Sequence, residues 1–80
     1  MKQLFPLHAS IMVENFDDII LDYDFSLVSL KENSIVCAYD HYLLEIQAER
    51  LHVKSMSSDR LHLHVHNLQL FNLTRKEKTV

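Results

Sequence analysis

The stretch Tyr42–Phe71 reads YLLEIQAERLHVKSMSSDRLHLHVHNLQLF and carries the clearest structural pattern in the chain. Apolar residues recur there at every second position, separated mostly by polar or charged ones: Leu44, Ile46, Leu51, Val53, Leu61, Leu63 and Val65. Because successive side chains of a β-strand point to opposite faces, this spacing predicts strands with one buried face and one solvent-facing face. The alternation then slips by one residue before Leu68 and Leu70, which predicts a bulge or bend near Asn67.

Weaker strand patterns lie towards the amino terminus. His8–Glu14 alternates weakly, and Ser34–Tyr39 is short and rich in β-branched and aromatic residues, so each predicts a strand. Between them, residues 16–31 show apolar spacings typical of a helix and also spacings typical of strands. Asp and aromatic residues are mediocre helix formers, which favours strands there.

The sequence therefore predicts an all-β fold, a small antiparallel β-sheet domain built as a sandwich or roll of about six to eight short strands. The alternative is an α+β fold with a helix at about residues 16–31. With 80 residues the chain is expected to form a single small β domain over residues 1–80, with loosely ordered ends at 1–7 and 74–80.

The chain contains no glycine. Asn and Asp are the residues that next most readily adopt the positive φ angles of tight turns, so turns are expected at Asn33, Asp40–His41 and Ser57–Asp59. The absence of glycine also excludes the glycine-rich loops that bind phosphates and dinucleotides.

Composition narrows the classes of function. The net charge is −3, with −5 on residues 1–40 and +2 on residues 41–80, so nucleic acid is not expected as a partner. A chain this short has few residues left to wall a substrate pocket, so we expect no small-molecule substrate. One cysteine, and no apolar stretch approaching the roughly 20 residues of a membrane helix, predict a cytoplasmic protein without a transmembrane segment.

Histidines provide the main candidate chemistry. His62, His64 and His66 alternate and should project from one face of a strand, and His52 joins them if the strands flanking Met56–Asp59 pair. Because neutral imidazole is the commonest nitrogen ligand of zinc, these four histidines are candidate metal ligands and zinc is the candidate cofactor. No carboxylate or thiol lies nearby in the sequence to complete a site, so a solvent-facing or partner-facing stripe is the simpler interpretation. We therefore favour no metal site and no cofactor.

No other residues form a convincing site. The acids Asp17, Asp18, Asp22 and Asp24 lack the regular offsets and the glycine of a calcium loop, and turn or helix-start positions explain them better. Cys37 lies between apolar residues without the local signature of a nucleophile. We predict no catalytic residues, no cofactor-binding residues and no enzymatic activity.

The run IMVENFDDIILDYD at residues 11–24, followed by LEIQAERLHVKSMSSDRLHLHV at residues 44–65, resembles the YabP/YqfC domain of endospore-forming bacteria. Asn15–Phe16 fits the Asn–aromatic step of that family, and the resemblance covers roughly residues 9–70. The later run has apolar residues at the family's spacing, namely Leu44, Ile46, Leu51, Val53, Met56, Leu61 and Leu63. It departs at the family's glycines, where Tyr42, Ala48 and Val65 stand.

The resemblance implies a small all-β domain with a non-enzymatic role in sporulation, in the mother-cell compartment, connected with late assembly of the spore envelope. Separately from the resemblance, small size, amphipathic strands and divided charge favour self-association or binding to another protein. Our hypothesis is therefore a non-catalytic assembly or scaffold protein that forms a homo-oligomer or binds another protein. The alternative is a zinc-binding domain that uses the His-x-His-x-His strand.

Overall fold

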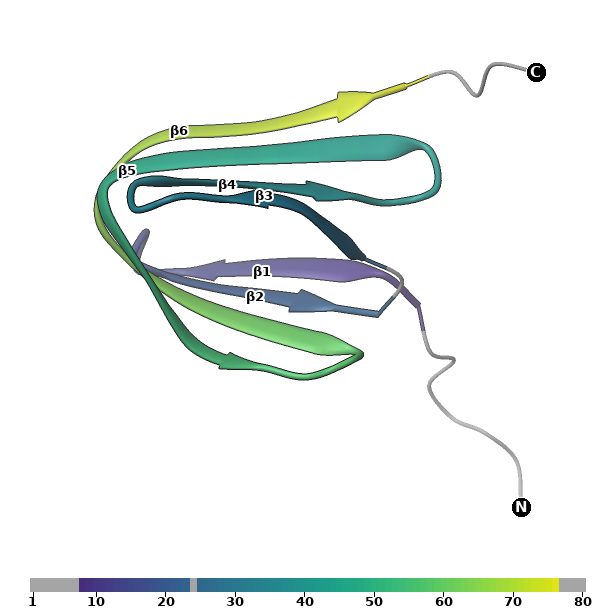
Figure 1. The fold of residues 1–80 in the computed structure, drawn as a ribbon, viewed down its shortest axis with the longest axis horizontal. Coiled ribbons are helices and arrows are strands. Elements are labelled where there is room, and N and C mark those ends of the chain that lie inside the picture. Colours follow the sequence, from purple (N-terminus) through teal and green to yellow (C-terminus); the bar gives the residue numbers. More distant parts are fainter. Residues whose placement is uncertain (1–7, 24, 77–80) are drawn as a thin grey trace.

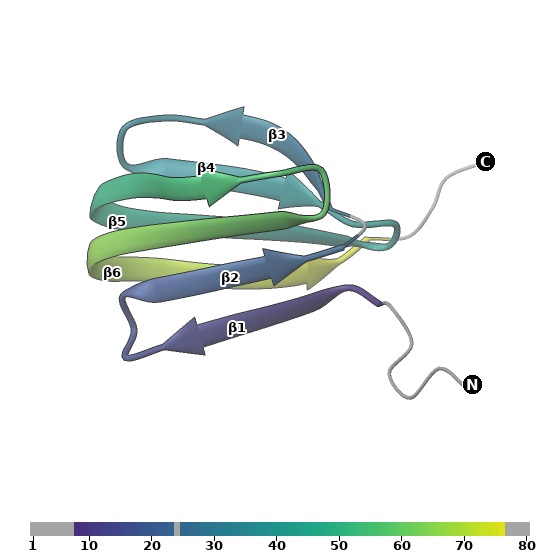
Figure 2. The ribbon, with the colours of Figure 1, turned by 90° about the horizontal axis from the view of Figure 1, so that it is seen from below.

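The computed structural model describes residues 8–23 and 25–76, which form one open antiparallel sheet. Its strands are β1 (Ser10–Glu14), β2 (Asp18–Asp22), β3 (Ser26–Leu30), β4 (Ser34–Ala38), β5 (Tyr42–Met56) and β6 (Arg60–Arg75). They lie in the order β1-β2-β6-β5-β4-β3, which can be followed across the sheet in Figure 2. The predicted all-β fold is confirmed. The alternative helix at residues 16–31 is wrong, because β2 and β3 occupy most of that range.

The sheet folds over on itself because β5 and β6 bend together (Figure 1). At the bend Asn67 has φ 56°, and the β5–β6 register shifts between Gln47 and Ala48, so the predicted irregularity near Asn67 is confirmed. β5 and β6 contain 15 and 16 residues and run through the bend without a break. The prediction that all strands are short is wrong for these two, because the bulge lets the ladder turn without ending.

The core lies between the two layers of this folded sheet. The fully buried side chains alternate along four strands: Ile19, Leu21, Ile35, Cys37, Leu44, Ile46, Ala48, Leu61, Leu63 and Val65. Burial of each large aliphatic side chain stabilises the fold by about 1.5–3 kcal/mol. Leu51 and Val53 belong to the same face but are only partly buried, because β4 pairs with β5 only as far as Gln47 and leaves this half of β5 at the margin of the sheet.

Two short hairpins dock on the long one in the same way. β2 pairs with the first half of β6, where Ile19 lies opposite Leu63 and Leu21 opposite Leu61. β4 pairs with the first half of β5 in the equivalent way, with Ile35 opposite Ile46 and Cys37 opposite Leu44. A backbone bond follows each pair: Val65 N–H donates to the Asp17 carbonyl at 2.7 Å, and Ala48 N–H donates to the Asn33 carbonyl at 3.0 Å. When the structurally equivalent residues Ile19 and Ile35 are aligned, the sequence DIILDY at 18–23 lies against SIVCAY at 34–39. The hairpins β1–β2 and β3–β4 are thus equivalent in structure, and the fold contains an internal repeat.

The chain makes its turns without glycine, and one of them was not predicted. Asn33, Asp40–His41 and Ser57–Asp59 lie in the loops where turns were expected. The unpredicted turn joins β1 to β2, where Asp17 N–H donates to the Glu14 carbonyl at 3.1 Å. Its central residues, Asn15 and Phe16, have φ of 54° and 56°, the type I′ pattern that favours Asn-Gly. A side chain with a Cβ costs about 1–2 kcal/mol in this conformation, so Phe16 strains the turn.

The ends of the chain lie partly outside this description. β6 continues through Thr74 and Arg75, which the sequence had placed in the loosely ordered carboxy-terminal end. The predicted loose ends at residues 1–7 and 77–80 lie outside the described residues. Within the described ranges, no helix is long and apolar enough to cross a membrane.

The strain at Phe16 predicts that a smaller residue can stabilise the protein. Phe16→Gly should raise the free energy of unfolding by about 1 kcal/mol, and the thermal midpoint by roughly 4–8 °C, because glycine adopts positive φ without a steric cost. Phe16→Ala is the matched control, since it also removes the ring but keeps the Cβ. Thermal unfolding at low protein concentration measures both. If the glycine variant is no more stable than the alanine variant, the turn is not strained.

Candidate functional site

Acidic and basic side chains meet on the outer face of the sheet where β2 pairs with β6. Asp18 lies opposite His64, Ile20 opposite His62, and Asp22 opposite Arg60. On the other side of β6, His52 of β5 lies opposite His64. The predicted pairing that brings His52 to the histidine face is therefore confirmed.

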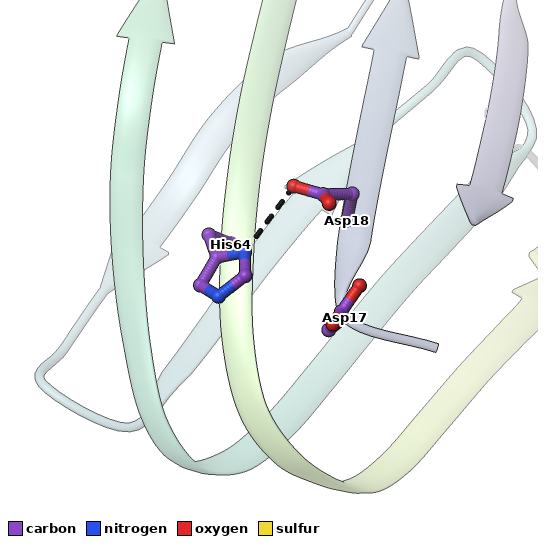
Figure 3. A group of neighbouring side chains, drawn as sticks. All are labelled: Asp17, Asp18 and His64. Atoms are coloured by element: carbon purple, nitrogen blue, oxygen red, sulfur yellow. Dashed lines mark hydrogen bonds and ion pairs between the residues drawn. The ribbon is translucent and has the colours of Figure 1, made fainter. Parts of the chain in front are cut away.

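Asp18 is the centre of a cluster on this face. Its Oδ1 atom lies 3.1 Å from Nε2 of His62 and 3.2 Å from Nδ1 of His64. Figure 3 shows Asp18 reaching from β2 to the ring of His64 on β6, with Asp17 directly before it in the chain. The cluster is half-buried: the side chains of His62, His64 and Asp18 are 28%, 44% and 32% exposed. Solvent and ions can therefore reach it.

Hydrogen bonding dominates the electrostatics of Asp18. Bonds from His62 and then from His64 lower the pKa of the Asp18 carboxyl below its ordinary value of 3.8, against a smaller opposing effect of burial. The carboxylate is thus ionised at neutral pH and offers its oxygens to a proton donor or a cation.

Asp18 is the residue that the sequence analysis missed. We found no carboxylate near the histidines because Asp18 is 44 residues from His62 and 46 from His64 in the chain. Only the pairing of β2 with β6 brings it there. The assignment of the acids to turns or a helix start holds for Asp17, whereas Asp18 and Asp22 lie on β2 and Asp24 lies outside the described residues. The repeat of IIL and IVC could have indicated where β2 docks.

A second ion pair lies beside the cluster. Arg60 Nε donates to Asp22 Oδ1 at 2.7 Å, and Arg60 Nη2 lies 3.3 Å from Asp22 Oδ2. Asp22 is the less exposed partner, with 16% of its side chain accessible. The acids of the amino-terminal half therefore partly neutralise bases of the carboxy-terminal half within one molecule, which explains part of the divided charge.

The other two candidate histidines lie apart from Asp18. His52 and His66 are exposed and, with Arg50 and His64, line a hollow of about 120 Å³ on the outer face. The positive charge of the Arg50 guanidinium disfavours a divalent cation in this hollow. The four candidate ligands thus divide into two pairs, and only His62 and His64 contact a carboxylate in the described structure.

Another hollow is apolar and lies between the start of β1, the start of β5 and the last part of β6. It has a volume of about 360 Å³ and is lined by Ala9, Ser10, Ile11, Tyr39, Tyr42 and Leu73. The Tyr39 hydroxyl is buried without a hydrogen-bond partner in the described structure, and burial raises the pKa of Tyr39 to about 12. Burial also raises the pKa of the Cys37 thiol to about 11, which keeps it protonated and unreactive.

Comparison of this chain with protein-family models, with curated proteins and with solved structures finds no match. The resemblance to the YabP/YqfC domain therefore stays a prediction.

The hydrogen bonds of Asp18 predict a specific loss of stability in acid. Since the pKa of Asp18 is lower in the folded than in the unfolded state, its contribution is present above about pH 4 and is lost as the pH falls below that value. Asp18→Asn should therefore lose less stability than the wild type on acidification. The measurement is the thermal midpoint of the wild type and of each variant at pH values above and below about 4, with a chelator present. Asp59→Asn, a carboxylate of the β5–β6 turn, is the control, and equal acid sensitivity of the wild type and Asp18→Asn would contradict the assignment.

Proposed function

We propose that this chain is a non-catalytic assembly protein whose copies associate through the free edge of β1. The observation that carries the proposal is the position of β1. It is the first strand of the sheet order, and among the described residues it pairs with β2 alone. The outer edge of such a strand presents backbone N–H and C=O groups that another strand can pair with.

The two terminal strands of the sheet differ in how well they can accept a partner. β1 pairs with β2 in unbroken register over its whole length, so its outer edge is also regular. In β3 the register shifts between Leu27 and Ser29, which leaves Val28 without a partner in β4. Bulges of this kind protect sheet edges from pairing with other chains. β1 is therefore the better edge for a second copy.

Exposed apolar side chains surround the β1 edge. Met12, Val13 and Phe16 are 54%, 37% and 75% exposed, and all belong to the β1–β2 hairpin. Backbone strain that burial does not offset often marks a functional position, and Phe16 is both strained and exposed. Since Met12 and Val13 are neighbours in β1 and point to opposite faces of the sheet, apolar surface lies on both sides of this edge and favours a protein partner over solvent.

A second copy fits this edge by symmetry. Antiparallel pairing of two β1 strands about Met12 places Ile11 opposite Val13, and Ser10 opposite Glu14. No two like charges then lie opposite each other across the new ladder. The two open sheets become one continuous sheet through a two-fold interface.

The biological setting follows from the resemblance to the YabP/YqfC domain. We propose a role in late formation of the spore envelope, in the cytoplasm of the mother cell. The support is that the chain forms the small all-β domain that the resemblance implies. Another spore-envelope protein can occupy the β1 edge in the same manner as a second copy.

A charge placed at the centre of the β1 edge should disrupt association. Met12→Lys should raise the dissociation constant of the oligomer at least about tenfold, since it sets two lysines together at the two-fold axis. Val28→Lys is the matched control, because Val28 of β3 is 58% exposed and Met12 54%. Sedimentation equilibrium over a range of concentrations measures both. A wild type that stays monomeric at tens of micromolar, or a Val28 variant that dissociates as readily, would contradict the proposal.

The proposed setting has a separate test. A fluorescent fusion expressed in a sporulating host should accumulate in the mother cell, around the developing spore, and Met12→Lys should disperse it if assembly positions the protein. A wild-type fusion that stays uniformly spread through sporulation would count against a role in the envelope.

A further inference from the structure

We propose that Asp17, Asp18 and His64 form a binding site for a divalent transition-metal ion of the zinc class. Each of the three residues offers one ligand atom, and these atoms lie within 4.8 Å of one another. Asp18 Oδ1 and His64 Nδ1 are 3.2 Å apart. Two atoms that share a tetrahedral zinc ion at bond lengths of 2.0–2.1 Å are about 3.3 Å apart. This pair is therefore already spaced for a common ion, and the Asp17 ligand atom lies within 4.8 Å of both.

The backbone holds these ligands in place. Asp18 lies directly opposite His64 in the β2–β6 ladder, so both side chains emerge on the same face. Asp17 precedes the strand, and its carbonyl accepts the N–H of Val65, the neighbour of His64, at 2.7 Å. The turn that carries Asp17 is thus fixed to β6 beside the histidine. Ligands on paired strands lose less freedom on binding an ion than ligands on a loop.

The internal repeat shows that the fold does not require these residues. The equivalent backbone bond in the second hairpin uses Asn33, and the equivalent of the Asp18–His64 pair is Ser34 opposite Gln47. The inner, apolar positions are similar in the two halves, whereas the outer positions differ. Packing therefore explains the shared pattern but gives no reason for two acids and a histidine on one half alone.

The donor set indicates the class of ion. Two carboxylate oxygens and one imidazole nitrogen suit zinc and related first-row ions, whereas calcium and magnesium prefer oxygen ligands alone. His62 Nε2, at 3.1 Å from Asp18 Oδ1, is placed to hold the carboxylate in position from outside the ligand set. With 44% of the His64 side chain exposed, the ion keeps room for a water molecule or for a ligand from another molecule.

The first measurement is titration of the purified chain with zinc chloride, followed by calorimetry and by the thermal midpoint. We expect one ion per chain and a midpoint that rises with zinc concentration, because an ion that binds the folded state stabilises it. Calcium chloride should give no rise. Cobalt(II) as the probe should give the visible absorption of a tetrahedral site.

Matched variants locate the site. Asp18→Asn and Asp17→Asn should each weaken zinc binding at least about tenfold. His52→Gln and His66→Gln are the controls, since they remove exposed imidazoles from the same face and should leave the affinity unchanged. Circular dichroism with a chelator present verifies that each variant is folded. The proposal is overturned if the wild type does not bind zinc, if Asp18→Asn binds as tightly, or if the control variants lose affinity, which would move the ion to the hollow beside Arg50.

Discussion

The structure depends on the continuous pairing of β5 with β6 through their common bend. One hairpin contributes strands to both layers, so the two halves of the core are connected by a single β5–β6 ladder that continues past its register shifts (Figure 1). β2 and β4 each dock on the first half of one of these long strands, and β1 and β3 add at the outside. A break at the bend would separate the layers and expose both inner faces. Asn67 adopts a positive φ within this ladder, and its amide side chain donates to Glu49 on the neighbouring strand.

The strands and their buried faces were predictable because they follow from local periodicity. Leu44, Ile46 and Leu61 mark the inner face by spacing alone, and the slip in that spacing located the bend at Asn67. The uninterrupted length of β5 and β6 was not predictable, since a bulge within one strand and a turn between two strands shift the apolar alternation in the same way. The turn at Asn15–Phe16 was missed because a phenylalanine at positive φ contradicts its local preference.

The candidate site is a product of topology, which local patterns do not encode. The histidine face was visible in the sequence as an alternation, but its carboxylate comes from a strand more than forty residues away. The same pairing that buries Ile19 and Leu21 on the inner face sets Asp18 against His62 and His64 on the outer face. Core burial thus also sets which acid faces the histidines, because it fixes the register of β2 against β6.

The two proposals meet on the β1–β2 hairpin. Its strand β1 offers the free edge, its turn carries the strained and exposed Phe16, and the next residues are Asp17 and Asp18. The proposed ion would therefore lie beside the turn that Phe16 occupies, next to the strand that a second copy would contact. One short hairpin thus carries both the unpaired strand edge and two of the three proposed metal ligands.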